Sequence, residues 1–347
     1  MRLKEVLHDY GEHLVYNPED RNFEGAQKRI NEMRQKIASA SRFELYSLWN
    51  IPFTLGANLP DNTLYNIMRI ATDITVYNVA TPPLIHSTIF DALSLKNDTL
   101  LTTNIGALIE TALKKIQDSP DPLHDLSHTL RVMQFGKVIF SLFKPHYPFL
   151  DWGTLATALA WHDIYRVDHV GFLYNNHHPK LPFQKKLRKI TALQDFIIAW
   201  YHGRDSIMSS LMFLKESKNK LPKKLRHTVA IAMLGEHTLD IFEKRTFEGI
   251  GLYKNIVYWA DNYDCISIAR WETGFHNSLK KNKTDIHLMN RYIVLNMLFG
   301  IQDIRKKITD PLARAIFDII LCMTVDHGKQ FYPTDARLAL DHIAPLT

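Results

Sequence analysis

The chain has 347 residues, of which 46% are hydrophobic and 22% charged, a composition typical of a globular protein with room for a large core. It contains no run of 18 or more apolar residues and no apolar leader near its start, which argues against a transmembrane helix and a secretory signal peptide. The two cysteines, Cys265 and Cys322, are too few for a disulfide scaffold. We therefore expect a cytoplasmic protein, in its own cell or, after specialised secretion, in a host cell.

The formal net charge of +6 is unevenly distributed. The segment from Lys180 to His227 contains twelve Lys or Arg against three Asp or Glu, a local net charge of +9. Such a segment suits a phosphate-bearing substrate, a nucleic acid or an acidic surface, and the alternative is a solvated pair of lysine-rich loops. Few aromatic residues lie among these cations, so a groove dedicated to single-stranded nucleic acid is not favoured.

Apolar residues recur at three- and four-residue spacing along most of the chain, which predicts an all-α fold. The predicted helices are Leu100–Lys115, Ser127–Phe143, Leu155–Ile164, Leu193–Tyr201, Arg226–Phe242, Ile256–Arg270, His287–Lys307 and Leu312–Thr324. Stretches in which apolar and polar residues alternate, as they do in β-strands, are too short to predict a β-sheet. We divide the chain into an N-terminal helical region (1–105), a histidine-rich core (106–280) and C-terminal helices packed on that core (281–347).

Ten of the 17 histidines lie between His124 and His237. His124 and His128 are four residues apart, so they share a face if both are helical, and Arg131 lies on that face too. Ordinarily a single histidine of this kind is a surface or structural residue. The spacing of these ten histidines along the chain makes some of them candidates for a functional site.

Several predicted helices end in, or contain, a polar group that is costly to bury. The dipeptide His162-Asp163 closes the apolar run 155–161, and His202 closes a second apolar run. His237 lies within a further apolar helix, and Asp261 lies among aromatic residues. A shared metal centre would remove the burial cost of all of these groups together, because imidazole and carboxylate become ligands.

The order His128, His162-Asp163, Asp261 resembles the HD superfamily of metal-dependent phosphohydrolases. The pattern HDxxHxxRV at 124–132 is similar to the first helix of many bacterial members, and Ala260-Asp261 looks like the last ligand helix of the family. The resemblance covers roughly residues 110–275. It implies an all-α HD-domain core, with additional N- and C-terminal helices in this chain.

The resemblance also implies a ligand set. His128, His162, Asp163 and Asp261 would bind a first metal, and Asp163 would bridge to a second. Members with two metals add two histidines between the HD pair and the last aspartate, and His202 and His237 fall in that interval. We therefore expect two divalent ions, chosen from Mn, Fe, Mg and Zn.

A catalytic histidine follows from the same comparison. In the cyclic-nucleotide phosphodiesterases of the superfamily, a histidine four residues before the first ligand protonates the leaving group, and His124 occupies that position.

Phosphoester hydrolysis needs a nucleophilic water at neutral pH and positive charge near the phosphoryl oxygens. A metal pair bridged by Asp163 would activate the water, and Arg131, Arg166 and Arg204 can hold phosphate oxygens in bidentate fashion. A solvated charge or a salt bridge is the alternative for each arginine. Weaker phosphate candidates at the rim of the cleft are Lys185, Lys186 and Lys189. The expected partner is a small phosphorylated substrate, with a nucleotide favoured, and the oligomeric state is open.

The chain also departs from the family. Ile164-Tyr165-Arg166 follows the HD pair where many members have glycine and then lysine or an acid, and the GYP tripeptide of cyclic-di-GMP phosphodiesterases is missing, as is the Glu-Asp pair of guanosine-tetraphosphate hydrolases. Met233 breaks the HxxEH pattern of zinc proteases, and the sequence has no P-loop and no nucleophile elbow. Two alternatives stay open: an HD-type di-iron oxygenase acting on a small polyol or phosphonate, and a non-enzymatic HD-derived binding module.

Overall fold

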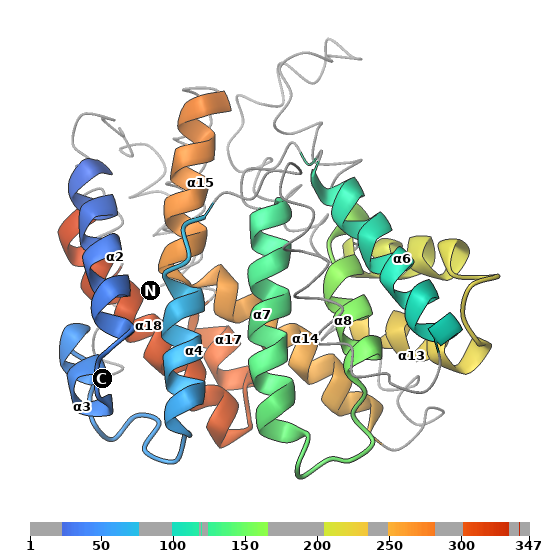
Figure 1. Ribbon diagram of the computed structural model, residues 1–347, viewed down its shortest axis with the longest axis horizontal. Helices are drawn as coiled ribbons and strands as arrows, with labels where there is room; N and C mark the ends of the chain where they lie inside the picture. The colour runs from blue at the N-terminus through green and yellow to red at the C-terminus, as the bar shows by residue number, and fades with distance from the viewer. Residues whose placement is uncertain are drawn as a thin grey trace. The chain divides into compact units, whose positions relative to one another are not determined.

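A computed structural model describes residues 23–75, 99–117, 119, 124–165, 205–234, 249–281, 301–332 and 340. Every regular element within these residues is an α-helix, which confirms the predicted all-α class (Figure 1). None of the described helices combines the length and the hydropathy needed to cross a membrane.

The chain divides into two compact units. Unit 1 comprises residues 1–75 together with 262–347, and unit 2 comprises residues 76–261. The borders thus lie at Thr75/Val76 and at Asp261/Asn262. The three-part division at 105 and 280 stays a prediction.

Unit 2 is built around a short, fully buried helix, α8 (Trp152–Trp161), which packs against three neighbours. These neighbours are α6 (Thr99–Gln117), α7 (Leu126–Phe143) and α13 (Lys223–Met233). All ten residues of α8 are buried, as expected for a helix that is apolar on every side. A helix at 205–216 and the first part of α14 (Ile250–Cys265) complete the described part of this unit.

Specific contacts fix α8 among its neighbours. The side chain of Asp151 caps its N-terminus by accepting the backbone N–H of Thr154 at 2.7 Å. The indole N–H of Trp161 donates to the carbonyl oxygen of Leu108 in α6 at 3.0 Å. Gly136 of α7 lies very close to Leu159 of α8. A Cβ atom added at Gly136 would stand 2.3 Å from Cδ1 of Leu159. The lack of a side chain at 136 lets α7 approach α8 closely.

Unit 1 joins helices from both ends of the chain. They are α2 (Phe23–Ile37), α3 (Arg42–Leu48), α4 (Asp61–Ala71), α15 (Ile268–Lys281), α17 (Ile301–Lys307) and α18 (Pro311–Phe331). The long helix α18 packs against α2, α4 and α15. Polar contacts tie the N- and C-terminal segments together: Asp326 accepts from both Arg29 and Asn50.

The predicted single helix at 256–270 is wrong. The structure has two helices there, α14 and α15, with a break at residues 266–267. Ser267 supplies the reason, since its Oγ accepts the backbone N–H of Arg270 at 3.0 Å, as an N-cap residue does. Arg270 in turn pairs with the fully buried Asp264 at 3.4 Å across the break.

The other predicted helices that lie within the described residues differ from the observed helices mainly in where they begin and end. Helix α8 begins and ends about three residues earlier than predicted, at Trp152 and Trp161, and α18 continues to Phe331. The predicted helix at 193–201 lies outside the described residues, as do parts of those at 226–242 and 287–307.

Replacing Asp151 with alanine should lower the free energy of unfolding by about 1 kcal/mol, because the first turn of α8 loses its cap. Urea unfolding followed by circular dichroism measures this change. Asp151→Ser, which keeps an oxygen acceptor, is the matched control and should lose only a fraction of that amount. An alanine variant as stable as the wild type would contradict the capping role.

Candidate metal centre

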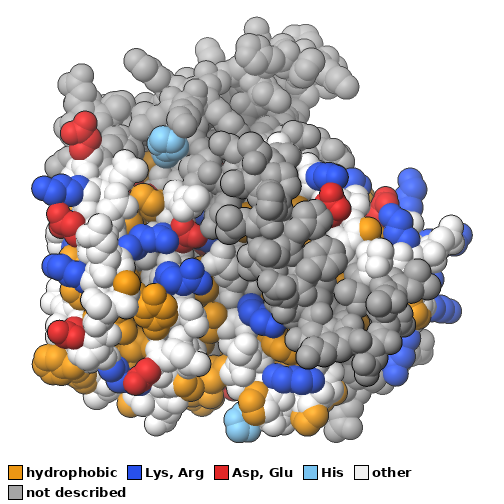
Figure 2. All heavy atoms as spheres, in the orientation of Figure 1, with side chains coloured by type: hydrophobic (Ala, Val, Ile, Leu, Met, Phe, Trp, Pro, Cys, Tyr) orange, Lys and Arg blue, Asp and Glu red, His pale blue; other side chains and the backbone are white. Residues whose placement is uncertain are grey.

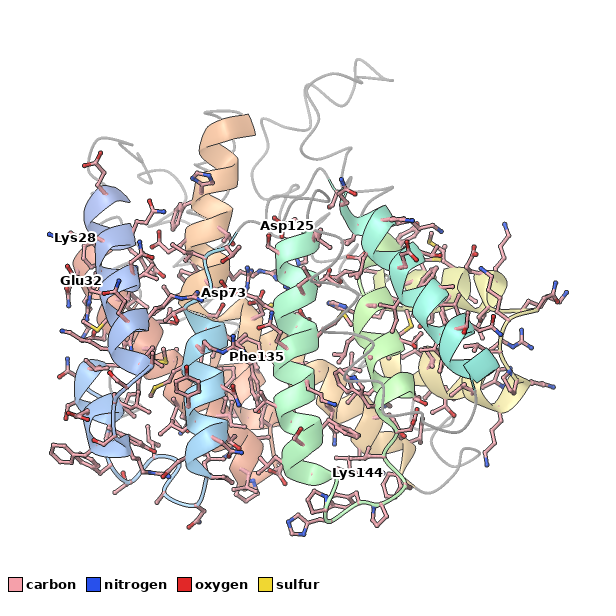
Figure 3. The ribbon with its side chains drawn as sticks, in the orientation of Figure 1. Lys28, Glu32, Asp73, Asp125, Phe135 and Lys144 are labelled. Carbon is pink, nitrogen blue, oxygen red and sulfur yellow. The ribbon has the colours of Figure 1, made fainter. Side chains whose placement is uncertain are left out.

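His128 is held at the start of α7 by the residue that caps this helix. The carboxylate of Asp125 accepts the backbone N–H of His128 at 2.9 Å. In Figure 3, Asp125 lies at one end of α7, Lys144 at the other and Phe135 between them. The imidazole of His128 is fully buried, and its position in the first helical turn leaves its backbone little freedom.

His162 and Asp163 follow directly after the last residue of α8. The Nδ1 atom of His162 lies 2.7 Å from the carbonyl oxygen of Leu159, one of the last four carbonyls of the helix, which lack an intrahelical partner. A carbonyl can only accept, so Nδ1 carries the hydrogen and donates it. In the neutral imidazole, Nε2 then presents a lone pair, which is the form that ligates a metal.

The fourth member of the group, Asp261, comes from α14 and follows the buried residues Trp259 and Ala260. Its side chain is 33% exposed, whereas that of His128 is fully buried and that of Asp163 is 11% exposed. The cluster therefore lies in unit 2, and Asp261 is its most exposed member.

These side chains converge closely. Nε2 of His128 lies 3.2 Å from Oδ2 of Asp163 and 3.5 Å from Oδ1 of Asp261. Nε2 of His162 lies 3.3 Å and 3.7 Å from the same two oxygens. The four donor atoms all lie within 4.8 Å of one another. Each imidazole nitrogen thus has both carboxylates next to it.

The electrostatics of the group favour a positive charge at its centre. Burial by itself would lower the pKa of His162, but the charges and hydrogen bonds of Asp163 and Asp261 outweigh burial and raise this pKa to about 10. Burial would raise the pKa of Asp261, but the interaction with His162 lowers it to about 2. Both shifts have one cause, namely two carboxylates that need a cation between them.

The spacing of the four donor atoms is compatible with a bound metal ion. Four ligands about 2.1 Å from one ion stand roughly 3.4 Å apart in a tetrahedron and about 3.0 Å apart at adjacent octahedral positions. The four nitrogen–oxygen distances, 3.2 to 3.7 Å, bracket the tetrahedral value. Two imidazoles and two carboxylates suit Zn²⁺, Mn²⁺ and Fe²⁺ alike, so this group could hold a metal ion, and its geometry does not select which one.

Two further predicted residues lie near this cluster. The ring of His124 is buried and its centroid lies 5.4 Å from that of His128. Arg131, one turn after His128 on α7, is only 1% exposed. The predicted roles of both residues in catalysis stay predictions.

The remaining predicted site residues lie outside the described residues. They are the second-metal histidines His202 and His237 and the phosphate candidates Arg166, Arg204, Lys185, Lys186 and Lys189. The described structure thus brings together four of the six predicted metal ligands.

Two supporting groups were not singled out from the sequence. Asp125 could have been found, because an aspartate just before an apolar periodic run is the usual signature of a helix N-cap. The carbonyl of Leu159 has no sequence signal at all, since every residue carries one.

A scan against protein-family models found no match for this chain. Searches of the curated proteins and of the solved structures found no matching protein either. The metal centre therefore rests on the geometry of His128, His162, Asp163 and Asp261.

We expect the protein to bind Mn²⁺ or Zn²⁺ and to be stabilised by it. An ion at 100 times its dissociation constant adds about 2.7 kcal/mol to the free energy of unfolding, which appears as a rise in melting temperature. His128→Ala and Asp163→Ala should abolish the rise, because each removes one of the four donors.

The matched control is His146→Ala, which removes an exposed histidine of the same unit and should leave the stabilisation intact. Elemental analysis and thermal unfolding with and without added metal measure both effects. An equal rise in the wild type and in Asp163→Ala would rule out this cluster as the binding site.

Proposed function

We propose that the protein is an HD-type metal-dependent phosphohydrolase that cleaves a phosphoester of a nucleotide or another small phosphorylated molecule. The observation that supports this proposal is the convergence of His128, His162, Asp163 and Asp261 at ligand-like spacing. These residues are also the ones on which the resemblance to the HD superfamily rests.

A divalent ion in the cluster would supply a nucleophilic water at neutral pH and positive charge for the phosphoryl oxygens. The chain would hold this ion rigidly, since His128 is ordered by the cap of α7 and His162 by the Leu159 carbonyl. The partial exposure of Asp261 would leave one side of the ion open to substrate.

Two nearby side chains have defined tasks in this proposal. His124, buried next to His128, would hold the proton that the leaving oxygen receives. Arg131 would contribute a fixed positive charge from within α7. Its burial limits solvent screening, so this charge would act more strongly than one on the surface.

The test is hydrolysis of a panel of nucleotide monoesters and diesters with added Mn²⁺, followed as free phosphate for the monoesters and as the monoester product, separated by chromatography, for the diesters. We expect activity in the wild type and none in His162→Ala or Asp163→Ala. His124→Gln should retain metal while its turnover falls about 10²- to 10⁴-fold, the usual contribution of a general acid. His146→Ala, an exposed control in the same unit, should be as active as the wild type.

Two outcomes would contradict the proposal. Phosphoester hydrolysis that survives in both His162→Ala and Asp163→Ala would place the activity elsewhere. Bound iron together with oxygen consumption, and no hydrolysis of any phosphoester in the panel, would favour the di-iron oxygenase alternative with the same ligands.

A further inference from the structure

Unit 2 carries a lysine-rich surface that the metal cluster does not use. We call it the basic ridge, and its described members are Lys114, Lys115, Lys215, Lys218, Lys220, Lys223 and Lys224. Six of these residues are exposed and Lys220 is half-buried. Figure 2 shows Lys and Arg side chains gathered along the edge where Figure 1 has the turn between 205–216 and α13.

Several ridge lysines surround one carboxylate. The hydrogen bond from Lys220, at 2.7 Å, lowers the pKa of Glu216, and the charges of Lys115 and Lys215 lower it further. The end of α6 and the end of helix 205–216 therefore bring their lysines to the same place. A hydrogen bond of 2.9 Å from Asn104 to the Lys220 carbonyl also joins α6 to this turn. Glu110 pairs with Lys114 at 2.6 Å and Glu216 pairs with Lys220 at 2.7 Å, so two acids stand against the seven lysines and the ridge keeps a positive net charge.

Helix 205–216 adds exposed apolar side chains to this charge. Ile207 is 42% exposed and Leu211 is 53% exposed. They lie four residues apart, and Lys215 follows four residues later, so the three side chains form one stripe on the helix. The opposite face is anchored by Phe213, which is buried and packs edge-on against Trp161 at 5.6 Å.

We propose that this stripe and the basic ridge dock on a lipid membrane that bears anionic headgroups. Ile207 and Leu211 would enter the boundary between headgroups and acyl chains, while the lysines would contact lipid phosphates and carboxylates. Exposed apolar residues beside lysines are the pattern of helices that lie in a membrane interface. Such docking needs no spanning helix.

The same lysines would attract nucleic acid, but the described residues favour lipid. Phe213 is the sole Phe, Tyr or Trp in residues 205–234, and it is buried, so this segment offers no aromatic platform for stacked bases. A phosphate backbone also gives Ile207 and Leu211 nothing to pack against, whereas a lipid layer does. The proposal involves none of the four metal-cluster residues, so it stands or fails independently of the proposed hydrolase activity.

The test uses the full chain, without added metal, in co-sedimentation with vesicles. We expect binding to vesicles of phosphatidylcholine mixed with phosphatidylserine, and little binding to phosphatidylcholine alone. Raising the salt concentration should weaken the binding, because it screens the lysines. Equal binding to both vesicle types, or none to either, would overturn the proposal.

Two double variants separate the charge from the apolar stripe. Lys215→Glu with Lys218→Glu should weaken binding roughly 25-fold or more, from about 1 kcal/mol for each lysine near an anionic surface. Ile207→Ser with Leu211→Ser should also weaken binding, and its remaining binding should depend on salt as before. All four side chains are exposed, and circular dichroism verifies that the fold is retained.

Matched controls come from unit 1. Lys28→Glu with Lys36→Glu makes the same charge change at exposed sites of α2, and Phe43→Ser removes an apolar side chain that is 65% exposed. Both controls should bind vesicles almost as the wild type does. If the unit 1 variants lost as much binding as the unit 2 variants, the attraction would be a general effect of net charge. If a single-stranded oligonucleotide bound more tightly than the vesicles and the ridge variants weakened that binding, the surface would be a nucleic-acid site.

Discussion

Two carboxylates and two imidazoles share a small, mostly buried space in unit 2, and this crowding is the constraint on which the described site depends. Asp163 and Asp261 each lie between 3.2 and 3.7 Å from both histidine nitrogens. Buried carboxylates at such spacing are tolerable only with positive charge between them. A bound metal ion would supply that charge without requiring a proton on either imidazole.

The surrounding helices serve to hold these groups still. Helix α8 ends at Trp161, just before His162 and Asp163. The carbonyl of Leu159 therefore has no intrahelical hydrogen-bond donor, and it orients the His162 ring by accepting from Nδ1. Helix α7 begins at the Asp125 cap, three residues before His128. Gly136 lets α7 and α8 approach each other closely. Because His128, His162 and Asp163 sit at helix ends, they lie where backbone groups are available to position side chains.

The two charged features of unit 2 differ in kind. At the cluster, charge is enclosed and interactions are strong and short-ranged, so single residues decide its chemistry. On the basic ridge the lysines are solvated, so each contributes little by itself. Binding to a membrane there would need many lysines acting together with the apolar side chains of Ile207 and Leu211. A protein that docked through the ridge would meet substrates at a membrane surface while its chemistry took place inside the helical unit.

Much of this architecture could be predicted from local patterns in the sequence. Apolar periodicity identified the all-α class and several of the described helices, among them α6, α7, α8 and α18, because the spacing of a helix face is a property of neighbouring residues. The convergence of His128, His162, Asp163 and Asp261 was predicted from the cost of burying such polar groups singly and from the resemblance to one family. Tertiary structure alone decided the break between α14 and α15, where Ser267 caps a new helix, and the tautomer of His162, which depends on a backbone carbonyl. It also decided that Ile207 and Leu211 stay exposed while Phe213 is buried, since a sequence pattern shows an apolar face but not which neighbour covers it.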